Sequence, residues 1–378
     1  MNVGQSSRGL SYVAFNQDST RVVFATRHGL RIVDCNTCKT VFEQFDGAVG
    51  IVEPLFSTSI LALVGAGEHP ALSPRRLGIL NITTGAPIAD LSFISSVLAV
   101  RMNRKRLVVL LERKTHIHDL QTLQILDTLE TAPNPKAICA FSPSTESSYL
   151  ALPASATAGE IVVYDAMHLT AVCQIQAHKA PLAALAINSD GSLLASASER
   201  GTVIRVHTLP SATKAFTLRR GTYPATIYSL AFSPPETVPP LLAAASDTGT
   251  LHLFSLAPRP PTPPPAASRP TKAAEEYLRR LLPETMSDVL ECDRAFASIP
   301  NSSQPGVRCL CTFAPERGRP PGTGPGSHDR ARVLIITAQG YLYEYCIDCR
   351  SSATDRCSLE REVALFPKES EQTTARFV

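Results

Sequence analysis

Short runs of alternating or continuous apolar residues, separated by turn residues, fill the chain before about residue 270. The clearest unit covers residues 181–220, where four strand-like segments are separated by "SDG", "ERG" and "PSAT". Residues 227–256 repeat the order of strand, turn, strand, turn and strand. Short runs bounded by Gly, Pro, Asn, Asp or Ser are typical of β-strands, and no long amphipathic helix is evident in this part. The pattern predicts an all-β protein.

The same order of elements recurs, more faintly, over residues 12–45, 52–93, 97–130, 137–178 and 307–348. Together with the two clear units this makes about seven units of roughly forty residues, the period of four-stranded propeller blades. Seven blades can close a ring that leaves only short, protected edges. We therefore predict one domain over residues 1–378, a single seven-bladed β-propeller of four-stranded blades. Because the chain has no Trp, the Trp-Asp signature of the commonest propeller repeats is missing.

Two segments interrupt the repeat. Residues 257–292, in the sixth blade, form a long insertion that opens with a proline-rich stretch and continues with a helical pattern. One face of that pattern carries Tyr277, Leu278, Leu281 and Leu282, and Pro283 should end or kink the helix. Residues 315–330 have the composition of a disordered loop between two strands of the last blade.

The overall charge limits the classes of partner. Lys and Arg number 36 against 33 Asp and Glu, a net charge of +3, which is too small for whole-molecule attraction to nucleic acid or an anionic membrane. We expect no nucleic-acid partner, and any anion site must be local. The chain also shows no secretory signal and no apolar stretch of membrane-spanning length, so we expect a cytosolic protein.

The ten cysteines are expected to be reduced thiols, because disulfides are rare in the cytosol. Two pairs, Cys35/Cys38 and Cys346/Cys349, have the internal spacing of zinc ligands but lie far apart in sequence. If the two ends of the chain met in a closed ring, a four-thiolate site would be conceivable. Free thiols are the simpler interpretation, so we expect no metal and no cofactor.

An arginine pair, Arg219 and Arg220, stands just before Gly221 at the end of the fifth unit. Successive side chains on a strand point to opposite sides, so adjacent arginines can serve two separate pockets. Guanidinium binds phosphate in a bidentate manner and stays charged near neutral pH. The alternative interpretation is a solvated strand end, which is what an isolated arginine pair usually is.

The sequence resembles the PROPPIN family of β-propellers, which bind phosphoinositides and act in autophagy and in endosomal or vacuolar membrane traffic. The resemblance rests on segments in the family's order, and one departure is Leu218 where the family motif Phe-Arg-Arg-Gly has Phe. These segments are "FNQD", "LVGAGEHPALSPRRL", "NRKRLVVLLE", "PNPKAICAFSPS", "AHKAPLAALAINSDGSLLASASERGTVIRV" and "RRGTYPATIYSLAFS".

The resemblance implies two headgroup sites for phosphatidylinositol 3-phosphate and 3,5-bisphosphate, one on each side of the arginine pair. Each would combine an arginine with hydroxyls of a Ser-x-x-Gly-Thr turn, and two weak sites on one rim would bind a membrane by avidity. Site 1 would comprise His178, Ser198, Thr202, Arg205 and Arg219, and site 2 Arg220, Ser246, Thr250 and His252. The competing interpretation of the serines is turn hydrogen bonding, and that of the histidines is partial burial.

The resemblance also gives the insertion and two basic stretches a role. The insertion would enter the membrane through Tyr277, Leu278, Leu281 and Leu282, although a tether with incidental helicity is an alternative. Pro74, Arg75 and Arg76 would engage a large autophagy lipid-transfer protein. Arg104 and Arg106 resemble the strip that recruits a subunit of the conjugation machinery in some members. Both stretches could instead be solvated turns.

The resulting expectation is a peripheral membrane effector, monomeric in solution, on phagophore, endosomal or vacuolar and lysosomal membranes. A protein-only scaffold with decayed lipid sites is the main alternative. An enzyme is disfavoured, because the sequence has no Gly-x-Ser-x-Gly elbow, no phosphate-binding Walker loop and no His-Glu-x-x-His.

Overall fold

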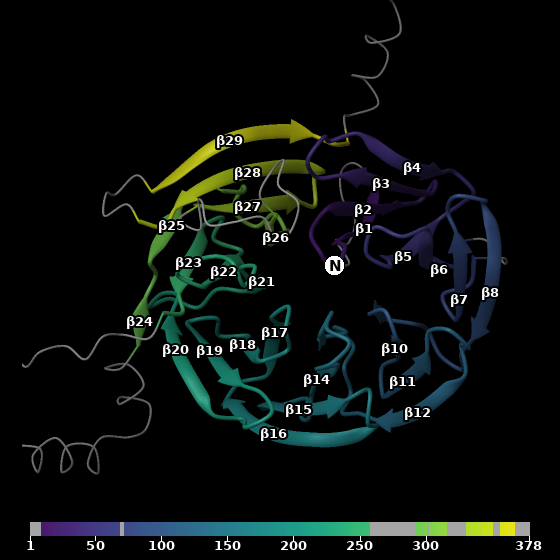
Figure 1. The fold of residues 1–378 in the computed structure, drawn as a ribbon, viewed down its shortest axis with the longest axis horizontal. Coiled ribbons are helices and arrows are strands. Elements are labelled where there is room, and N and C mark those ends of the chain that lie inside the picture. The colour runs from purple at the N-terminus through teal and green to yellow at the C-terminus, as the bar shows by residue number, and fades with distance from the viewer. Residues whose placement is uncertain are drawn as a thin grey trace, which may run out of the picture.

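The computed structural model is a ring of seven antiparallel sheets around a central channel, as Figure 1 shows. It describes residues 9–68, 72–257, 292–300, 302–315, 330–350 and 356–366. The predicted seven-bladed propeller of mostly four-stranded blades is therefore confirmed, and each predicted unit corresponds to one blade. None of the described residues forms a helix long and apolar enough to cross a membrane.

Blades 1 to 4 follow the chain without exchange of strands, and each runs from the channel outward. Blade 1 contains β1 (Leu10–Phe15), β2 (Arg21–Thr26), β3 (Leu30–Asp34) and β4 (Thr40–Gln44). Blade 2 contains β5 (Val49–Pro54), β6 (Ile60–Gly65), β7 (Arg76–Asn81) and β8 (Ala86–Ser92). Blade 3 contains β9 (Ala99–Met102), β10 (Arg106–Leu110), β11 (Lys114–Asp119) and β12 (Ile125–Glu130). Blade 4 contains β13 (Ala140–Phe141), β14 (Tyr149–Pro153), β15 (Gly159–Asp165) and β16 (Thr170–His178).

Blades 5 to 7 carry the departures from this plan. Blade 5 contains β17 (Leu182–Ile187), β18 (Leu193–Ser198), β19 (Val203–Thr208) and β20 (Lys214–Arg219), and gains a fifth strand, β24 (Asp293–Arg294). Blade 6 contains β21 (Ile227–Phe232), β22 (Leu241–Ser246), β23 (Leu251–Ser255) and β25 (Ala297–Ile299). Blade 7 contains β26 (Cys309–Ala314), β27 (Arg330–Thr337), β28 (Tyr341–Asp348) and β29 (Cys357–Ala364). Residues 258–291 of the predicted insertion 257–292, between β23 and β24, lie outside the described residues, as do residues 316–329 of the predicted loop 315–330.

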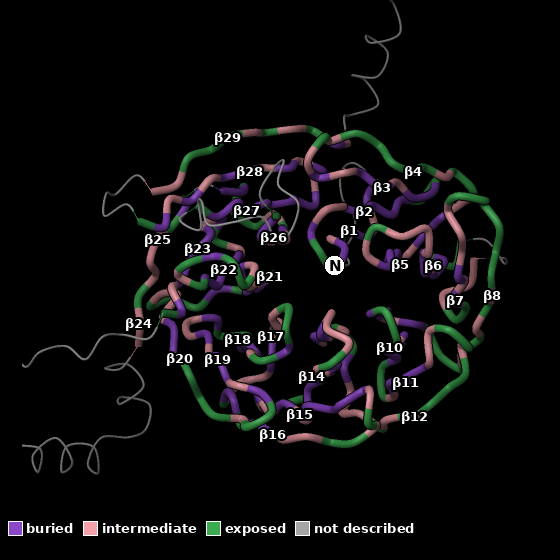
Figure 2. The backbone as a smooth tube through the Cα atoms, viewed as in Figure 1, coloured by how far each residue is buried: buried purple, intermediate pink, exposed green. Residues whose placement is uncertain are grey.

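Burial follows the position of each strand within its blade (Figure 2). The second strands, such as β2, β18 and β22, are buried almost throughout because neighbouring blades cover both faces. The outermost strands β4, β8 and β12 are largely exposed and alternate in burial, as expected where only one face is covered. Each hydrophobic cluster therefore joins adjacent blades; one of them joins Val22 and Phe24 of blade 1 to Leu334 and Ile336 of blade 7.

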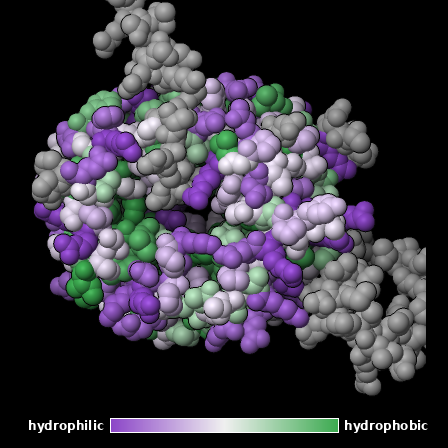
Figure 3. Space-filling model, turned by 180° about the vertical axis from the view of Figure 1, so that it is seen from behind, coloured by the Kyte–Doolittle hydropathy of each residue, from purple (hydrophilic) through white to green (hydrophobic). Residues whose placement is uncertain are grey.

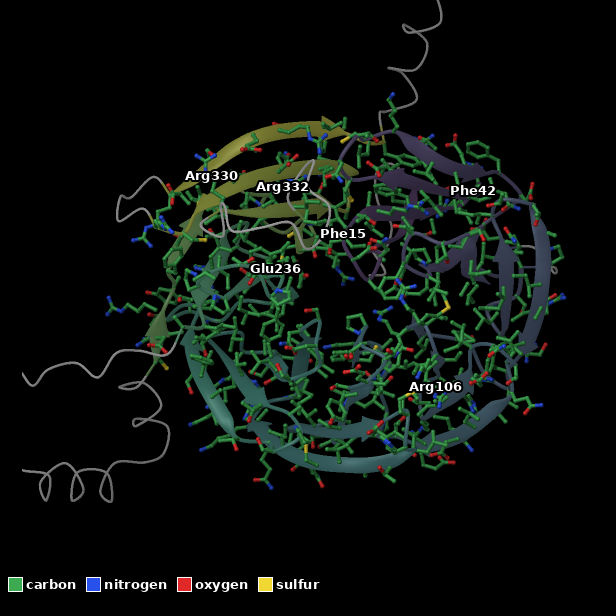
Figure 4. The ribbon with its side chains drawn as sticks, viewed as in Figure 1. Phe15, Phe42, Arg106, Glu236, Arg330 and Arg332 are labelled. Atoms are coloured by element: carbon green, nitrogen blue, oxygen red, sulfur yellow. The ribbon has the colours of Figure 1, made fainter. Side chains whose placement is uncertain are left out.

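The ring closes without strand exchange, because blade 1 uses only N-terminal strands and blade 7 only C-terminal ones. Polar contacts reinforce the apolar cluster at this seam. Arg361 donates to the backbone oxygens of Cys35 (2.6 Å) and Asn36 (2.8 Å), and Arg332 donates to Asn36 Oδ1 (3.0 Å). Arg332 is labelled in blade 7 in Figure 4. Ser19 and Thr312 hydroxyls lie 2.6 Å apart across the same seam.

A channel of about 1570 Å³ runs through the centre of the ring and is lined by residues of all seven innermost strands. It is visible from behind as the hollow near the middle of Figure 3. All ten cysteines are free. Cys346 lies within β28, and among the described residues no three His, Cys, Asp or Glu side chains gather as a metal site.

Candidate functional site

The arginine pair lies at the outer end of blade 5, where β20 ends at Arg219 and the chain turns toward blade 6. Leu218 is fully buried and packs with apolar residues of blade 6, among them Ile227 and Leu242. Because side chains alternate along a strand, Arg219 projects from the opposite face of the sheet, toward blade 4. The buried Leu218 thus fixes the direction of the guanidinium that follows it.

Several polar side chains share the blade 5 face that Arg219 occupies. Arg205 pairs with Thr217 on β20 and with Ser196 on β18, and two-residue alternation adds Ser198 and Arg219 to the same face. Arg205 donates from Nη1 to the Ala177 carbonyl (2.7 Å) at the end of β16 in blade 4. The face therefore borders the gap between blades 4 and 5, and Ser198, Arg205 and Arg219 of predicted site 1 share it. Thr202 alternates with Val203 and so shares the face of Ile204, on the side of blade 6.

His178, the last residue of β16, orients Arg205. Its Nδ1 lies 3.0 Å from Arg205 Nη1 and its Nε2 lies 3.0 Å from Ser196 Oγ and 3.1 Å from the Ser196 carbonyl. Because a guanidinium can only donate, Nδ1 must accept, so the ring is neutral and carries its proton on Nε2. Both ring nitrogens have protein partners, which gives His178 a positioning role.

Arg220 lies in a different environment. Its backbone N–H donates to the Thr202 carbonyl (3.0 Å), Nε donates to the Gly201 carbonyl (2.8 Å), and Nη2 donates to the Tyr223 carbonyl. These contacts hold the side chain over the Ser198–Thr202 turn. Burial lowers the pKa of Arg220, and nearby Asp247 in blade 6 raises it. The two adjacent arginines therefore do not form one cluster.

The predicted residues of site 2 lie on the blade 6 face that points toward blade 5. His252 pairs with Ala244 on β22, and Ala244 belongs to the apolar cluster shared with blade 5. Two-residue alternation places Ser246 and Thr250 on the same face. Burial, and then the positive charge of Arg220, lower the pKa of His252.

The two Ser-x-x-Gly-Thr turns have the same backbone plan. The N–H of Gly201 donates to the Ser198 carbonyl (2.9 Å), and the N–H of Gly249 donates to the Ser246 carbonyl (3.2 Å). Both glycines have positive φ, +57° and +76°, and a Cβ on Gly201 would stand 1.8 Å from the Ala225 carbonyl oxygen. Ser198 and Ser246 are buried, at 6% and 1% exposure, so their hydroxyls lie beneath the surface of each turn.

Two features near the arginines were not predicted from the sequence. Tyr223, in the turn after the arginines, is 83% exposed although it is a large aromatic residue. Arg294, on β24, is exposed and pairs with Arg219 across the outer edge of blade 5. Adjacency to the arginine motif could have identified Tyr223, whereas Arg294 lies 75 positions beyond Arg219 and its placement depends on the fold.

The predicted partner residues lie in blades 2 and 3, away from the arginine pair. Arg76 forms an exposed ion pair with Asp90 (2.6 Å), and Arg104 stacks over the Phe56 ring at 4.5 Å. Arg106 is only 12% exposed; it pairs with Asp119 (3.0 Å) and donates to the Ala166 carbonyl (2.8 Å). Figure 4 labels it in blade 3. Arg104 is therefore better placed than Arg106 to meet a partner.

Pro74 and Arg75 sit beside Arg76 in the connection from β6 to β7, and their carbonyls accept from Val97 (2.8 Å) and Phe93 (2.9 Å). A small, mostly apolar pocket of about 290 Å³ lies between blades 1 and 2 and is lined in part by Leu72, Arg76 and Asp90. The membrane-insertion residues Tyr277, Leu278, Leu281 and Leu282 lie outside the described residues.

The ring of seven antiparallel sheets defines the chain as a seven-bladed β-propeller, and comparison with known proteins gives the family. The PROPPIN family model matches residues 9–365, so the chain belongs to the PROPPIN family. It is an Atg18-type autophagy β-propeller and a non-enzymatic scaffold.

Two relatives show the extent of the similarity. Autophagy-related protein 18b of Arabidopsis thaliana is 44% identical over 357 residues, which cover 94% of this chain and 95% of the relative. Autophagy-related protein 18 of Yarrowia lipolytica is 36% identical over 406 residues, covering 95% and 97%.

Solved structures agree on the fold. Hsv2 of Kluyvelomyces marxianus has a TM-score of 0.72 at 16% identity and covers 96% of this chain and 100% of its own. KlAtg21, solved in complex with the coiled coil of AgAtg16, has a TM-score of 0.70 at 23% identity, with 94% and 99% covered.

Proposed function

We propose that this protein binds phosphatidylinositol 3-phosphate and 3,5-bisphosphate through two sites at the outer edge of blades 4, 5 and 6. The observation that carries the proposal is the divergence of Arg219 and Arg220 to different faces and partners of blade 5. Site 1 uses Arg205 and Arg219, with His178 orienting Arg205. Site 2 uses Arg220 and His252. Family membership supports phosphoinositide binding as the class of function.

The chemistry of the two sites suits a phosphorylated headgroup. Guanidinium groups form bidentate hydrogen bonds to phosphate oxygens, and no carboxylate of the described residues lies within 4.0 Å of the Arg219 or Arg220 guanidinium. The positive charge at each site is therefore available to an anion. Two weak sites on one rigid blade edge would engage one membrane together, since binding at the first raises the effective concentration at the second.

Tyr223 lies in the turn that leads from the arginine pair to blade 6, and we place it against the lipid interface. Aromatic rings with a polar tip favour the headgroup region of a bilayer. The Arg220 guanidinium holds the Tyr223 carbonyl, so the ring stands on a turn fixed by a lipid-binding residue. Its 83% exposure leaves it available for this contact.

The insertion would add a second contact with the membrane. It leads into β24, which pairs with β20 at Leu218 and Arg219, so its C-terminal end lies at the outer edge of blade 5 beside the arginine pair. Tyr277, Leu278, Leu281 and Leu282 would supply its apolar anchors. The related KlHsv2 has been solved with loop 6CD replaced by a Gly-Ser linker, so that propeller forms without the loop.

Protein partners would bind elsewhere on the ring. Blade 2, with Pro74, Arg75, Arg76 and the adjoining pocket, is proposed to receive the large lipid-transfer protein. Arg104, with Arg106 behind it, is proposed to meet a coiled-coil subunit of the conjugation machinery, by analogy with the KlAtg21 complex. The protein would then act as a monomer that connects these partners to phagophore, endosomal or vacuolar and lysosomal membranes.

Titration with vesicles of defined composition tests the lipid sites. The wild-type chain should bind vesicles containing either phosphorylated lipid and should not bind vesicles of plain phosphatidylinositol. Replacing Arg219 and Arg220 together by Thr should reduce binding by roughly 100-fold or more, since each charge-assisted contact contributes about tenfold. The fold should remain, because both residues lie at the edge of the core; circular dichroism would check this.

Arg113→Thr, in the exposed turn between β10 and β11 of blade 3, is the control because it removes a positive charge from a surface outside both sites. It should bind like wild type. If the wild-type chain bound plain and phosphorylated vesicles equally, the protein-only scaffold would replace this proposal. Undiminished binding by the double variant would disprove the site assignment.

A further inference from the structure

The chain that follows the insertion crosses from blade 6 to blade 5 before it completes blade 6. Strand β24, residues Asp293 and Arg294, pairs in parallel with β20 and forms a fifth strand on blade 5. Only after this crossing does β25 pair with β23 to complete blade 6. Figure 1 shows β24 outside β20 at the edge of the ring. Its two pairs are Leu218 with Asp293 and Arg219 with Arg294.

This register places two arginines side by side. Paired residues on neighbouring strands project from the same face of a sheet, about 5 Å apart at the backbone. Arg294 therefore projects from the face that carries Arg219 and Arg205, the face toward blade 4. Asp293 pairs with Leu218 and so lies on the opposite face, where it does not neutralise the two guanidiniums.

Two like charges at paired positions of a sheet destabilise the pairing. The cost is notable here because β24 has only two residues. Neither guanidinium has an ion-pair partner among the described residues, and the only hydrogen bond from the Arg219 side chain goes to Thr222 Oγ1 at 3.4 Å. An anion held between Arg219 and Arg294 would neutralise this repulsion. Each guanidinium could then donate hydrogen bonds to the oxygens of one phosphate.

We infer that Arg294 is a further phosphate ligand of site 1 and binds the same phosphomonoester as Arg219. The inference rests on the proposed function, since it adds a residue to one of the two headgroup sites. Headgroup binding and the pairing of β24 on β20 are then linked: a bound phosphate stabilises the two-residue strand, and the strand places Arg294 at the phosphate.

A soluble headgroup, inositol 1,3-bisphosphate, tests this without membrane avidity. The experiment uses the full chain with Arg220→Thr, which removes the arginine of site 2. Isothermal calorimetry then measures headgroup binding to site 1. In that background Arg294→Gln should weaken binding about tenfold, the loss expected for one charge-assisted contact. Arg294→Lys should recover part of the affinity, and Arg113→Gln should bind unchanged. A parallel titration with inorganic phosphate shows whether the inositol ring contributes.

Thermal unfolding separates a ligand from a structural residue. Without headgroup, Arg294→Gln removes a repulsion, so its Tm should equal or exceed that of the parent. With saturating headgroup the parent should gain more in Tm than the variant, because a ligand stabilises the native state in proportion to its affinity. A lowered Tm without headgroup, together with an unchanged affinity, would make Arg294 structural and overturn the inference.

The outcomes distinguish the two proposals. Suppose that the Arg220→Thr parent binds the headgroup and that adding Arg219→Thr abolishes this binding. If adding Arg294→Gln instead leaves the affinity unchanged, only the role of Arg294 is wrong. If the parent and the wild-type chain both fail to bind the headgroup or phosphorylated vesicles, the proposed function itself is wrong. Inorganic phosphate that binds as tightly as the headgroup would overturn the assignment to an inositol lipid.

Discussion

Arg219 and Arg220 are neighbours in sequence, yet they differ in how strongly the protein holds them. Arg220 donates hydrogen bonds from two guanidinium nitrogens to the carbonyls of Gly201 and Tyr223. Among the described residues, the Arg219 side chain donates one long hydrogen bond, to the Thr222 hydroxyl. Replacing Arg220 therefore removes a positive charge and also the hydrogen bonds that hold the turn toward blade 6. Replacing Arg219 removes mainly a positive charge. The two single variants are not equivalent probes of lipid binding.

The pKa of His252 depends on the positive charge of Arg220 and can therefore be used to follow the replacement of that arginine. Burial and the positive charge of Arg220 hold that pKa below 6.5, so the ring is neutral at pH 7. Its neutral form stabilises the fold fully above pH 6.5, and that stability is lost as the pH falls through the lowered pKa. Arg220→Thr should move the pKa of His252 back toward 6.5, because it removes the neighbouring charge. A bound headgroup should raise it further, because a phosphate favours the imidazolium form.

Ring resonances of His252, followed by NMR during a pH titration, measure this shift. His207 is the matched control, since burial and then Arg205 and Lys214 lower its pKa to about 4 without involving Arg220. The His207 titration should not change in the Arg220→Thr variant. An unchanged His252 titration would show that Arg220 does not face this imidazole.

At the residue scale, sequence reasoning identified side chains by motif and could not assign their contacts. The pair Arg219–Arg220 and the two serine turns were recognisable because their spacing is local. Arg106 was indistinguishable from Arg104 in "NRKR", yet the fold buries Arg106 against Asp119 and leaves Arg104 on Phe56. Both contacts cross between segments distant in sequence or on other strands, and no local pattern encodes them.

At the scale of elements, the sequence predicted the repeat of the strands but not the crossing of β24 from blade 6 to blade 5. Residues 181–220 and 227–256 predicted blades 5 and 6 because turn residues mark each hairpin. Strand β24 has two residues, both of them charged, and pairs in parallel with a strand of another blade. Such a short pairing is specified by the path of the chain around it and leaves no hydrophobic pattern.

The insertion can be tested as an element because it leads directly into β24, the strand that pairs with Arg219. Replacing residues 258–290 by a short Gly-Ser linker should leave the affinity for inositol 1,3-bisphosphate unchanged, since site residues and β24 remain. Retention on vesicles should fall, because apolar anchors add to membrane binding in proportion to the area they bury. Flotation after vesicle binding measures retention. Adding Tyr223→Ala to the deletion should reduce retention further.

Phe45→Ala is the control for this series, because Phe45 is 66% exposed but belongs to blade 1. It should not change retention. Equal retention of the deletion variant and the wild-type chain would reduce the insertion to a spacer between β23 and β24.

At the scale of the whole molecule, closure of the ring depends on the contact between blades 1 and 7. The sequence predicted seven blades but not how the first meets the last, because that contact joins residues some three hundred positions apart. Glu344 illustrates the difficulty: within "YLYEYCID" it reads as a solvent-facing position, yet it is fully buried. It accepts from Arg332 (2.7 Å) and Arg361 (2.8 Å), the two arginines that reach Asn36 and Cys35 of blade 1.

Glu344→Gln should therefore weaken the ring at its seam. The change leaves two guanidiniums next to each other without the carboxylate between them, and losing one member of a buried ionic network costs about 3–5 kcal/mol. The free energy of unfolding, measured by urea denaturation, should fall by about that amount.

The control is Glu130→Gln, which breaks the exposed ion pair with Lys114 and should lower the free energy of unfolding by less than about 1 kcal/mol. If both variants lost the same small amount, the apolar cluster of Phe24 and Leu334 alone would hold the seam. The headgroup affinity of the folded protein should stay unchanged in Glu344→Gln, because blades 4 and 5 lie across the ring from the seam and blade 7 separates blade 6 from it (Figure 1).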